Sequence, residues 1–319
     1  MRPRAPGIWA VLMTAAVTLS ITGCSIKQMA VRRMGDALAS SSRSTFASDD
    51  DPELVGDALP FALKLMESLL ARVPDHRGLL LAASSGFTQY SYVWVQQPAE
   101  ELELQDVEKA RVIRLRARQL YLRARDYGLR GLELKHSGFE AALRGNPKKA
   151  VHVTTKSDVP LLYWTAASWG SAISVSKDDP ALVADQPIVE ALIDRSLQLN
   201  PDFDQGAIHG LLINYEAARQ GVKGDFAVRS RQHFSRQVEL TGGNLASPFV
   251  ALAETVSVSK QNRAEFESLL KRALAINPDV KPEWRLSNIV MQRRARWLLS
   301  RSDDLFLSEN EEEPNATSN

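Results

Sequence analysis

Histidines are the side chains to examine first for chemistry, because an imidazole can act as a general base or bind a metal ion. The chain has five of them: His76, His136, His152, His209 and His233. No two have the spacing of a helical metal site, and the only cysteine is Cys24, so we expect no zinc site. His209 and Glu216 lie about two turns apart on one expected helix and could form an acid/base pair with a third group. A histidine at the surface or at the edge of the core is the more frequent situation.

The sequence also lacks the motifs of common enzymes. It has no G-x-S-x-G elbow, no P-loop and no dinucleotide-binding fingerprint. Near pairs of acidic residues occur, but they are expected by chance among 38 aspartates and glutamates. We therefore expect a protein that is not an enzyme and uses no cofactor. A hydrolase, the one enzyme class still to consider, would need an acid/base pair around His209.

Three aromatic residues are the candidates for lining a ligand cavity. Tyr163, Trp164 and Trp169 occur among small residues in the segment LLYWTAASWGSAISVS. Because a buried Tyr or Trp usually needs a hydrogen-bond partner, such a cluster could border a partly apolar cavity. Aromatic residues at helical spacing more often pack in a core. The sequence leaves both interpretations open.

The N-terminus has the anatomy of an export signal. Arg2 and Arg4 precede an apolar run from Ile8 to Leu19, which is too short for an ordinary membrane-spanning helix. The run ends in Ile21-Thr22-Gly23-Cys24, which resembles the lipobox of bacterial lipoproteins. We predict a signal peptide over residues 1–23 and lipidation of Cys24, whose acyl chains would hold the protein at a membrane. By the sorting rule of Gram-negative lipoproteins, a serine after the cysteine indicates the outer membrane.

The composition of the mature chain favours an ordinary globular protein. Removal of Arg2 and Arg4 changes the formal net charge from +1 to −1, so no basic excess indicates nucleic acid. Hydrophobic residues make up 44% of the chain. No later stretch is apolar enough to span a membrane, and the one strand-like piece is Ala150 to Val153. We predict an all-α fold.

The expected helices form hairpins. In the stretch from Asp49 to Gln97, Leu59, Leu63, Met66 and Leu70 share one helical face, and Val73-Pro74-Asp75 ends the helix. Pro60 should kink this helix or mark a second start. A small-residue helix follows. The same stop returns at Asn200-Pro201-Asp202 and Asn277-Pro278-Asp279, and a glycine stop occurs at Thr241-Gly242-Gly243-Asn244.

These hairpins predict the domain organisation. The stops are irregularly spaced and do not follow the period of about 34 residues of tetratricopeptide repeats. We predict an irregular tetratricopeptide-like array of about four hairpins over residues 49–307. Residues 24–48 should be a tether with a helix near 26–38. Residues 308–319 are acidic and polar and should form a disordered tail.

Two further segments carry expectations. Residues 99–134 should be a long helical region that begins acidic and turns basic. Its basic half could bind a partner, but a solvated face with the ion pairs Asp106–Lys109 and Glu108–Arg111 is the more frequent situation. Residues 143–159 are polar and should form a loop.

Long segments of the chain resemble one known family, the T component associated with TRAP transporters. The resemblance extends from about residue 45 to 306 and is carried by DDDPELVGDALPFALKLMESLLARVPDHRGLLLAASSGFTQYSY, YLRARDYGLRGLE, VPLLYWTAASWGSAISVSKDDPALVADQPIVEALI and HFSRQVELTGGNLASPFVALAE. It implies an exported lipoprotein with a tetratricopeptide-like body. It also implies assembly as a homotrimer, docking to the periplasmic solute-binding P component, and a cleft or pore for a hydrophobic or carboxylated ligand. The lipobox cysteine of the family maps onto Cys24, and no catalytic motif is carried over.

The leading hypothesis is therefore a periplasmic, lipid-anchored accessory subunit for solute uptake. The alternative is a tetratricopeptide-type scaffold lipoprotein that acts in outer-membrane assembly. Both hypotheses share the anchor and the fold, so the identity of the co-purifying protein or of the neighbouring genes would separate them.

Overall fold

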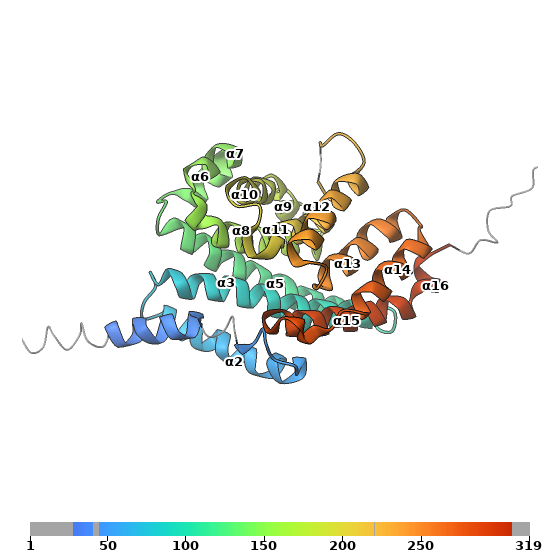
Figure 1. Ribbon diagram of the computed structural model, residues 1–319. Helices are drawn as coiled ribbons and strands as arrows, with labels where there is room; N and C mark the ends of the chain where they lie inside the picture. Colours follow the sequence, from blue (N-terminus) through green and yellow to red (C-terminus); the bar gives the residue numbers. More distant parts are fainter. Residues whose placement is uncertain (1–27, 41–44, 220, 308–319) are drawn as a thin grey trace, which may run out of the picture.

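The computed structural model describes residues 28–40, 45–219 and 221–307 (Figure 1). Within these ranges the chain is helical and contains no strand, which confirms the all-α prediction. Residues 28–40 form a helix without a label in the figure. The α-helices that follow are α2 Pro52–Leu70, α3 Arg77–Ser91, α4 Gln97–Leu102, α5 Val107–Glu133, α6 Phe139–Gly145, α7 Pro147–Ala150, α8 Val159–Ser174, α9 Pro180–Val183, α10 Gln186–Leu199, α11 Phe203–Tyr215, α12 Phe226–Thr241, α13 Ser247–Leu252, α14 Arg263–Leu274, α15 Arg285–Ser300 and α16 Ser302–Leu305.

Shorter helical segments connect some of these helices. Two are π-helical, η1 Tyr92–Gln96 between α3 and α4 and η4 Ala253–Ser257 after α13. Four are 3₁₀ helices: η2 Val151–Val153, η3 Lys156–Asp158, η5 Pro278–Val280 and η6 Pro282–Trp284. The strand-like prediction for residues 150–153 is wrong, because this piece is the end of α7 and η2. The loop prediction for residues 143–159 is wrong for the same reason: Asn146 caps α7, and Pro147 occupies its first position.

The first hairpin consists of α2 and α3. Asp51 caps α2 by accepting a hydrogen bond from the backbone N–H of Leu54 at 3.0 Å, and Pro52 occupies the first turn. The helix continues through Pro60 to Leu70, so a second start at Pro60 is wrong. The predicted stop after α2 is confirmed, as are the stops after α10, α12 and α14. The tetratricopeptide-like character of these pairs stays a prediction.

The long helical region predicted for residues 99–134 is divided in the structure. A turn after Leu102 separates α4 from α5. Asp106 caps α5 by accepting a hydrogen bond from the N–H of Lys109, so its carboxylate serves the backbone rather than the lysine side chain. The predicted pair between Glu108 and Arg111 is present, with 2.9 Å between the two groups.

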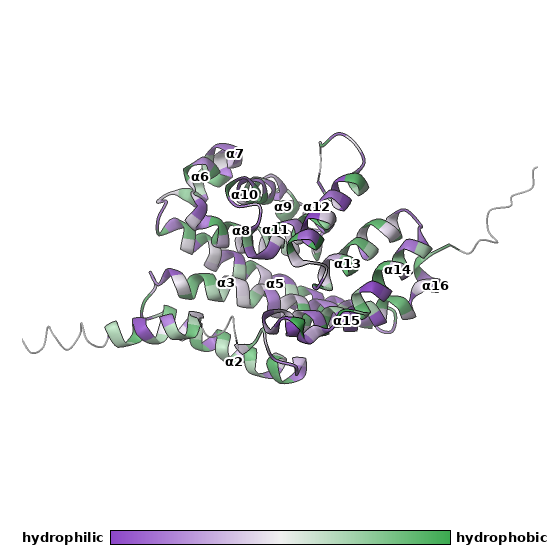
Figure 2. Cartoon of the chain, in the orientation of Figure 1, coloured by the Kyte–Doolittle hydropathy of each residue, from purple (hydrophilic) through white to green (hydrophobic). Residues whose placement is uncertain are grey.

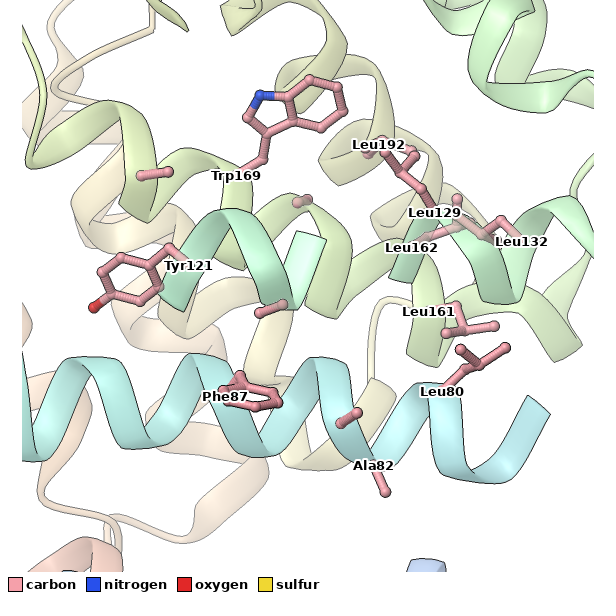
Figure 3. Close-up of a cluster of buried hydrophobic side chains, with 14 of the residues drawn as sticks. Leu80, Ala82, Phe87, Tyr121, Leu129, Leu132, Leu161, Leu162, Trp169 and Leu192 are labelled. Atoms are coloured by element: carbon pink, nitrogen blue, oxygen red, sulfur yellow. The ribbon is translucent and has the colours of Figure 1, made fainter. Parts of the chain in front are cut away.

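The larger hydrophobic core lies among α3, α5, α8 and α10 (Figure 3). Its largest fully buried side chains include Trp169, Tyr121 and Leu192. Gly128 of α5 lets this helix approach α8 closely, because a methyl group there would overlap Thr165 Oγ1. Figure 2 shows hydrophilic and hydrophobic residues alternating along the helices, as expected when each helix buries one side.

A second core forms among α13, α14 and α15. At this core the last helices of the chain meet the first ones. Tyr92 and Val93 of η1 pack against this second core, so the continuous helical rod α3–η1–α4 contacts both cores. At the far end of the chain, the N–H of Leu286 donates to the carbonyl of Ala47 at 3.0 Å. Figure 1 shows α15 lying beside the α2–α3 hairpin. The first and last hairpins are therefore neighbours.

The helix at residues 28–40 packs on the body. Ala39 is buried in the larger core, and Arg32 forms two 2.7 Å hydrogen bonds with the carboxylate of Asp75. His76 Nε2 lies 3.1 Å from the carbonyl oxygen of Arg32. The part of the predicted tether that the structure describes is thus mostly docked. Cys24, the signal segment 1–23 and the tail 308–319 lie outside the described residues.

Candidate functional site

The three aromatic residues predicted to border a cavity lie on α8 with different degrees of burial. Trp169 is fully buried, and the guanidinium of Arg125 lies 4.9 Å from its ring centroid. Tyr163 and Trp164 are half-buried and contact each other edge to face, with ring centroids 4.9 Å apart. Tyr163 also contacts Phe203 of α11 at 5.6 Å. Neither of the two grooves described below is lined by these residues, and the cavity stays a prediction.

The structure supplies a third group beside His209 and Glu216. His233 of α12 places its Nδ1 2.9 Å from Nδ1 of His209, and its Nε2 3.9 Å from a carboxylate oxygen of Glu216. One imidazole must donate and the other accept, so at least one of the two rings is neutral. Burial lowers the pKa of His209. Burial and the neighbouring His209 lower the pKa of His233 to about 4.

The carboxylate beside this histidine pair is held by two arginines. Glu216 is 3% exposed and is held by Arg229 at 2.5 Å and Arg219 at 3.3 Å, so its charge is already balanced. Among the described residues, Nε2 of His209 is buried and has no hydrogen-bond partner. The arrangement is a buried polar link between α11 and α12.

A strained turn lies next to the pair at the start of α11. Asp204, Gln205 and Gly206 all have positive φ angles, of 47°, 55° and 81°. A non-glycine residue in this region costs on the order of 1 kcal/mol or more. Gly206 is required for a second reason, because a Cβ there would lie 2.9 Å from Leu240 of α12. The turn therefore brings α11 close to α12.

A largely buried ionic centre lies where the array closes. Arg294 of α15 is 8% exposed and donates to Glu254 of η4 through Nε at 3.0 Å and Nη2 at 2.6 Å. Its Nη2 also lies 2.6 Å from a carboxylate oxygen of Glu100 on α4. Its Nη1 is buried and has no hydrogen-bond partner. Three distant parts of the chain thus meet at one guanidinium.

Charge and burial at this centre shift the pKa values of its members. Burial raises the pKa of Glu254, and Arg294 opposes that shift. The two glutamates hold the pKa of Arg294 above its usual range, against the effect of burial. Burial also raises the pKa of the Tyr92 hydroxyl to about 12. At neutral pH we therefore expect Arg294 to be charged and Tyr92 to be neutral.

Both π-helical segments adjoin this centre. Glu254 belongs to η4, and Glu100 lies one turn after η1. Such segments occur frequently at functional sites. A groove of about 240 Å³ opens beside Arg294 and is lined by Glu100, Glu103, Glu254, Val258, Arg294, Trp297, Leu298, Arg301 and Leu305. Arg294 and Arg301 lie 4.3 and 4.9 Å from the ring of Trp297.

The sequence alone does not predict this centre. Arg294 belongs to an arginine-rich run, MQRRARW, in which nothing marks one arginine as buried. Glu100 and Glu254 are separated from it by 194 and 40 positions along the chain. One pattern in the sequence does indicate burial near Glu254. The small and apolar residues around it favour a buried helix over the segment SPFVALAETV.

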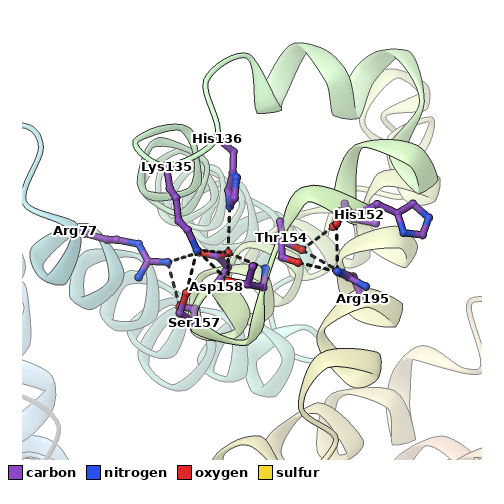
Figure 4. Close-up of polar contacts among 10 residues, drawn as sticks. Arg77, Lys135, His136, His152, Thr154, Ser157, Asp158 and Arg195 are labelled. Atoms are coloured by element: carbon purple, nitrogen blue, oxygen red, sulfur yellow. Dashed lines mark hydrogen bonds and ion pairs between the residues drawn. The ribbon is translucent and has the colours of Figure 1, made fainter.

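A second polar cluster surrounds Asp158 at the start of α8 (Figure 4). Its carboxylate is fully buried and accepts hydrogen bonds from Arg77, Lys135 and the backbone N–H of Thr155, and His136 Nε2 lies 3.1 Å away. These contacts hold the pKa of Asp158 well below its usual range, although burial alone would raise it. The cluster joins α3, α5 and α8, so its evident role is structural.

The basic half of α5 is largely paired within the chain. Arg114 lies 2.8 Å from Glu103, and Arg118 contacts Asp179. Further along the helix, a shallow groove of about 400 Å³ is lined by Gln119, Leu122, Arg123, Asp126, Tyr127 and Arg130. These contacts are those of a solvated face with ion pairs.

In the part of the chain that the structure describes, no group of three or more His, Cys, Asp or Glu side chains could hold a metal ion. No helix among those residues is both long enough and apolar enough to cross a membrane.

The fold and its sites define an all-helical protein whose polar centres join helices and border grooves. Comparison with known proteins makes the class specific. The family model of the TRAP transporter T-component matches residues 48–306, and the chain belongs to this family. An uncharacterized protein of Treponema pallidum (strain Nichols) is 29% identical over an alignment of 319 positions, which covers 95% of this chain and 99% of that protein. The family prediction is confirmed, and the chain is an accessory subunit of a TRAP transporter.

Proposed function

We propose that this T component is a lipid-anchored periplasmic subunit that docks the solute-binding P component of its transporter. The observation that carries the proposal is the family match over residues 48–306, which covers the whole described body from α2 onward. The closed helical array supports a binding role, because it offers broad rigid surfaces. The lipobox at Cys24 supports the anchor and an outer-membrane location.

Docking is tested with purified proteins. The full acylated chain, held in detergent, is mixed with the P component of the same transporter and analysed by size-exclusion chromatography with light scattering. We expect a complex that elutes ahead of both proteins, and the mass of the T component alone tests the homotrimer. A helical lipoprotein of similar size from another system serves as the control. If the P component elutes unchanged at micromolar concentrations of both proteins, the docking proposal fails.

The groove beside Arg294 is the place where we propose that a hydrophobic or carboxylated ligand binds. Val258, Leu298 and Leu305 provide apolar walls, and Arg294 and Arg301 provide cationic groups at the groove. A carboxylate placed beside a guanidinium can form charge-assisted hydrogen bonds with it. The cavity at Tyr163, Trp164 and Trp169 is the competing proposal, in which the partly buried Tyr163 and Trp164 would contact the ligand.

The two ligand proposals are separated by filling one groove at a time. Decanoate is the probe for a carboxylated ligand and decanol for a neutral one, and binding is followed by the shift in thermal unfolding. We expect Val258→Trp to abolish the shift, whereas Val228→Trp should leave it unchanged. Val228 is a matched control, since it is an exposed valine on α12 and does not line the groove. Loss of the shift in Trp164→Ala instead would favour the aromatic cavity.

The anchor is tested by changing the residue predicted to carry it. In the Cys24→Ala variant we expect the protein to leave the membrane fraction and appear in the soluble periplasmic fraction. Mass spectrometry of the wild-type N-terminal peptide should show the acyl chains. An unmodified Cys24 in the exported protein would remove the anchor from the proposal.

A further inference from the structure

The N-terminal part of the body exposes apolar side chains that the interior does not use. Met29 and Met34 of helix 28–40 are 49% and 56% exposed, and Leu54 and Phe61 of α2 are 59% and 75% exposed. We call these four residues and the two helices that carry them the N-terminal face. Figure 1 shows both helices along the lower edge of the molecule, in blue.

Helix α2 is apolar on two sides. Its buried side carries Val55, Leu59, Leu63, Met66 and Leu70. A second stripe, Leu54, Ala58, Phe61 and Leu65, follows steps of four, three and four residues, and it is exposed or half-buried. A helix at the surface of a water-facing array needs only one apolar stripe. The second stripe therefore indicates a surface that is covered in the working protein.

The helix at residues 28–40 has a fixed orientation relative to the body. The two hydrogen bonds between Arg32 and Asp75, together with buried Ala39, hold one side of this helix against the body. Met29 and Met34 lie on the side that remains exposed. Their exposure is thus a property of the docked helix.

The length of chain between Cys24 and this helix limits what can cover the face. Residue 28 follows Cys24 by four positions, and a fully extended chain spans about 3.5 Å per residue. An acylated Cys24 would therefore hold the start of the helix within about 14 Å of the bilayer. A folded partner protein is wider than this gap, whereas the lipid surface is already there.

The charged side chains near the face are compatible with contact with lipid. Arg32 is paired with Asp75, and Lys64 of α2 lies 2.5 Å from Glu67. Paired charges carry a smaller net field than isolated ones, so these two pairs add little net charge to the face. An amphipathic helix of this kind lies in the plane of a membrane interface with its apolar side toward the acyl chains.

We propose that the N-terminal face lies against the lipid bilayer and orients the anchored body, with Met29, Met34, Leu54 and Phe61 facing the membrane surface. This inference rests on the lipid anchor of the proposed function. It goes beyond that function, because it assigns one side of the molecule to the membrane and leaves the opposite side for partners.

The experiment places a fluorophore on the face. Cys24 is the only cysteine and would be acylated, so Phe61→Cys and Met34→Cys each provide one free thiol for an environment-sensitive label. The full acylated chain is reconstituted in vesicles of phosphatidylethanolamine and phosphatidylglycerol with and without a lipid that carries a quencher. Val153→Cys is the matched control, because Val153 is 57% exposed and lies in η2. This segment directly follows α7 at the upper edge of Figure 1.

We expect blue-shifted emission and several-fold stronger quenching at positions 61 and 34 than at position 153. Equal quenching at the three positions in protein that floats with the vesicles would overturn the inference and leave the anchor intact. Protein that does not float would remove the anchor, and with it the inference. A blue shift that needs a second copy or the P component, with no quenching by lipid, would assign the face to that protein instead.

Discussion

The buried pair of His209 and His233 makes a quantitative prediction about acid stability. The pKa of His233 is lowered from the ordinary 6.5 to about 4, first by burial and then by His209. Because the folded state binds its proton less tightly than the unfolded state, keeping the imidazole neutral costs no stability while the pH stays above about 6.5. Stability is then lost progressively as the pH falls from 6.5 toward 4.

The size of the effect follows from the shift. A difference of about 2.5 pKa units corresponds to about 3 kcal/mol when the full range is crossed. At pH 5, where the shift is only partly expressed, the loss is about 2 kcal/mol. That is a large share of the 5–15 kcal/mol typical of a folded protein.

The assay is urea unfolding of the full chain at pH 7.5 and pH 5, compared between wild type and His233→Gln. We expect the variant to be less stable than wild type at pH 7.5, because His209 loses its 2.9 Å partner. Between pH 7.5 and pH 5, however, the free energy of unfolding of the variant should fall by about 2 kcal/mol less than that of wild type. His152→Gln is the control, since His152 is exposed and should leave the pH dependence unchanged. If wild type and His233→Gln lose the same free energy between the two pH values, the buried neutral pair is refuted.

Three further variants test the packing and the ionic centres, each by the midpoint of urea unfolding. Gly128→Ala should cost about 2 kcal/mol, because the new methyl group overlaps a threonine of α8, whereas Gly145→Ala meets no atom within 4 Å and should be close to neutral. Arg294→Met should cost about 3 kcal/mol, since it leaves two partly buried glutamates without their cation, and Arg293→Met, in an exposed pair, should have a much smaller effect. Asp158→Asn should cost about 2 kcal/mol at pH 7, and the difference from wild type should shrink below about pH 4, because the lowered pKa of Asp158 contributes stability only while the unfolded carboxylate is ionised. The contacts described would be contradicted if the two glycine variants, or the two arginine variants, lost the same free energy of unfolding. A loss in Asp158→Asn that does not change with pH would contradict them as well.

Signals that lie within one or two turns of the chain were readable from the sequence. Val73-Pro74-Asp75 ends a helix because of the backbone limits that proline imposes, and those limits act on its neighbours alone. The same holds for Gly242, which ends α12 in the left-handed conformation. Asn146-Pro147 is a local helix-start signal too, although the polarity of the surrounding segment favours a loop.

Features that depend on distant contacts were not readable. Asp158 looks like any polar residue before a helix, and only Arg77 and Lys135, 81 and 23 positions away, make it a buried carboxylate. The two π-helical segments have no pattern that a single sequence reveals. Arg294 directly follows the exposed Arg293 in α15. Only the helices packed around α15 determine that Arg294 is buried and Arg293 is not. The sequence therefore does not indicate Arg294 as a candidate binding residue.

The closure of the array also constrains the order in which the chain can fold. Arg285 donates to the carbonyl of Ser48 across 237 positions, and Arg293 pairs with Glu53 across 240. Such contacts form only after the last helices have been synthesised. Until α15 arrives, the first hairpin and the glutamate of α4 remain open to water, and the second core is incomplete. A chain cut short before α15 would therefore leave both ends of the molecule without their contacts.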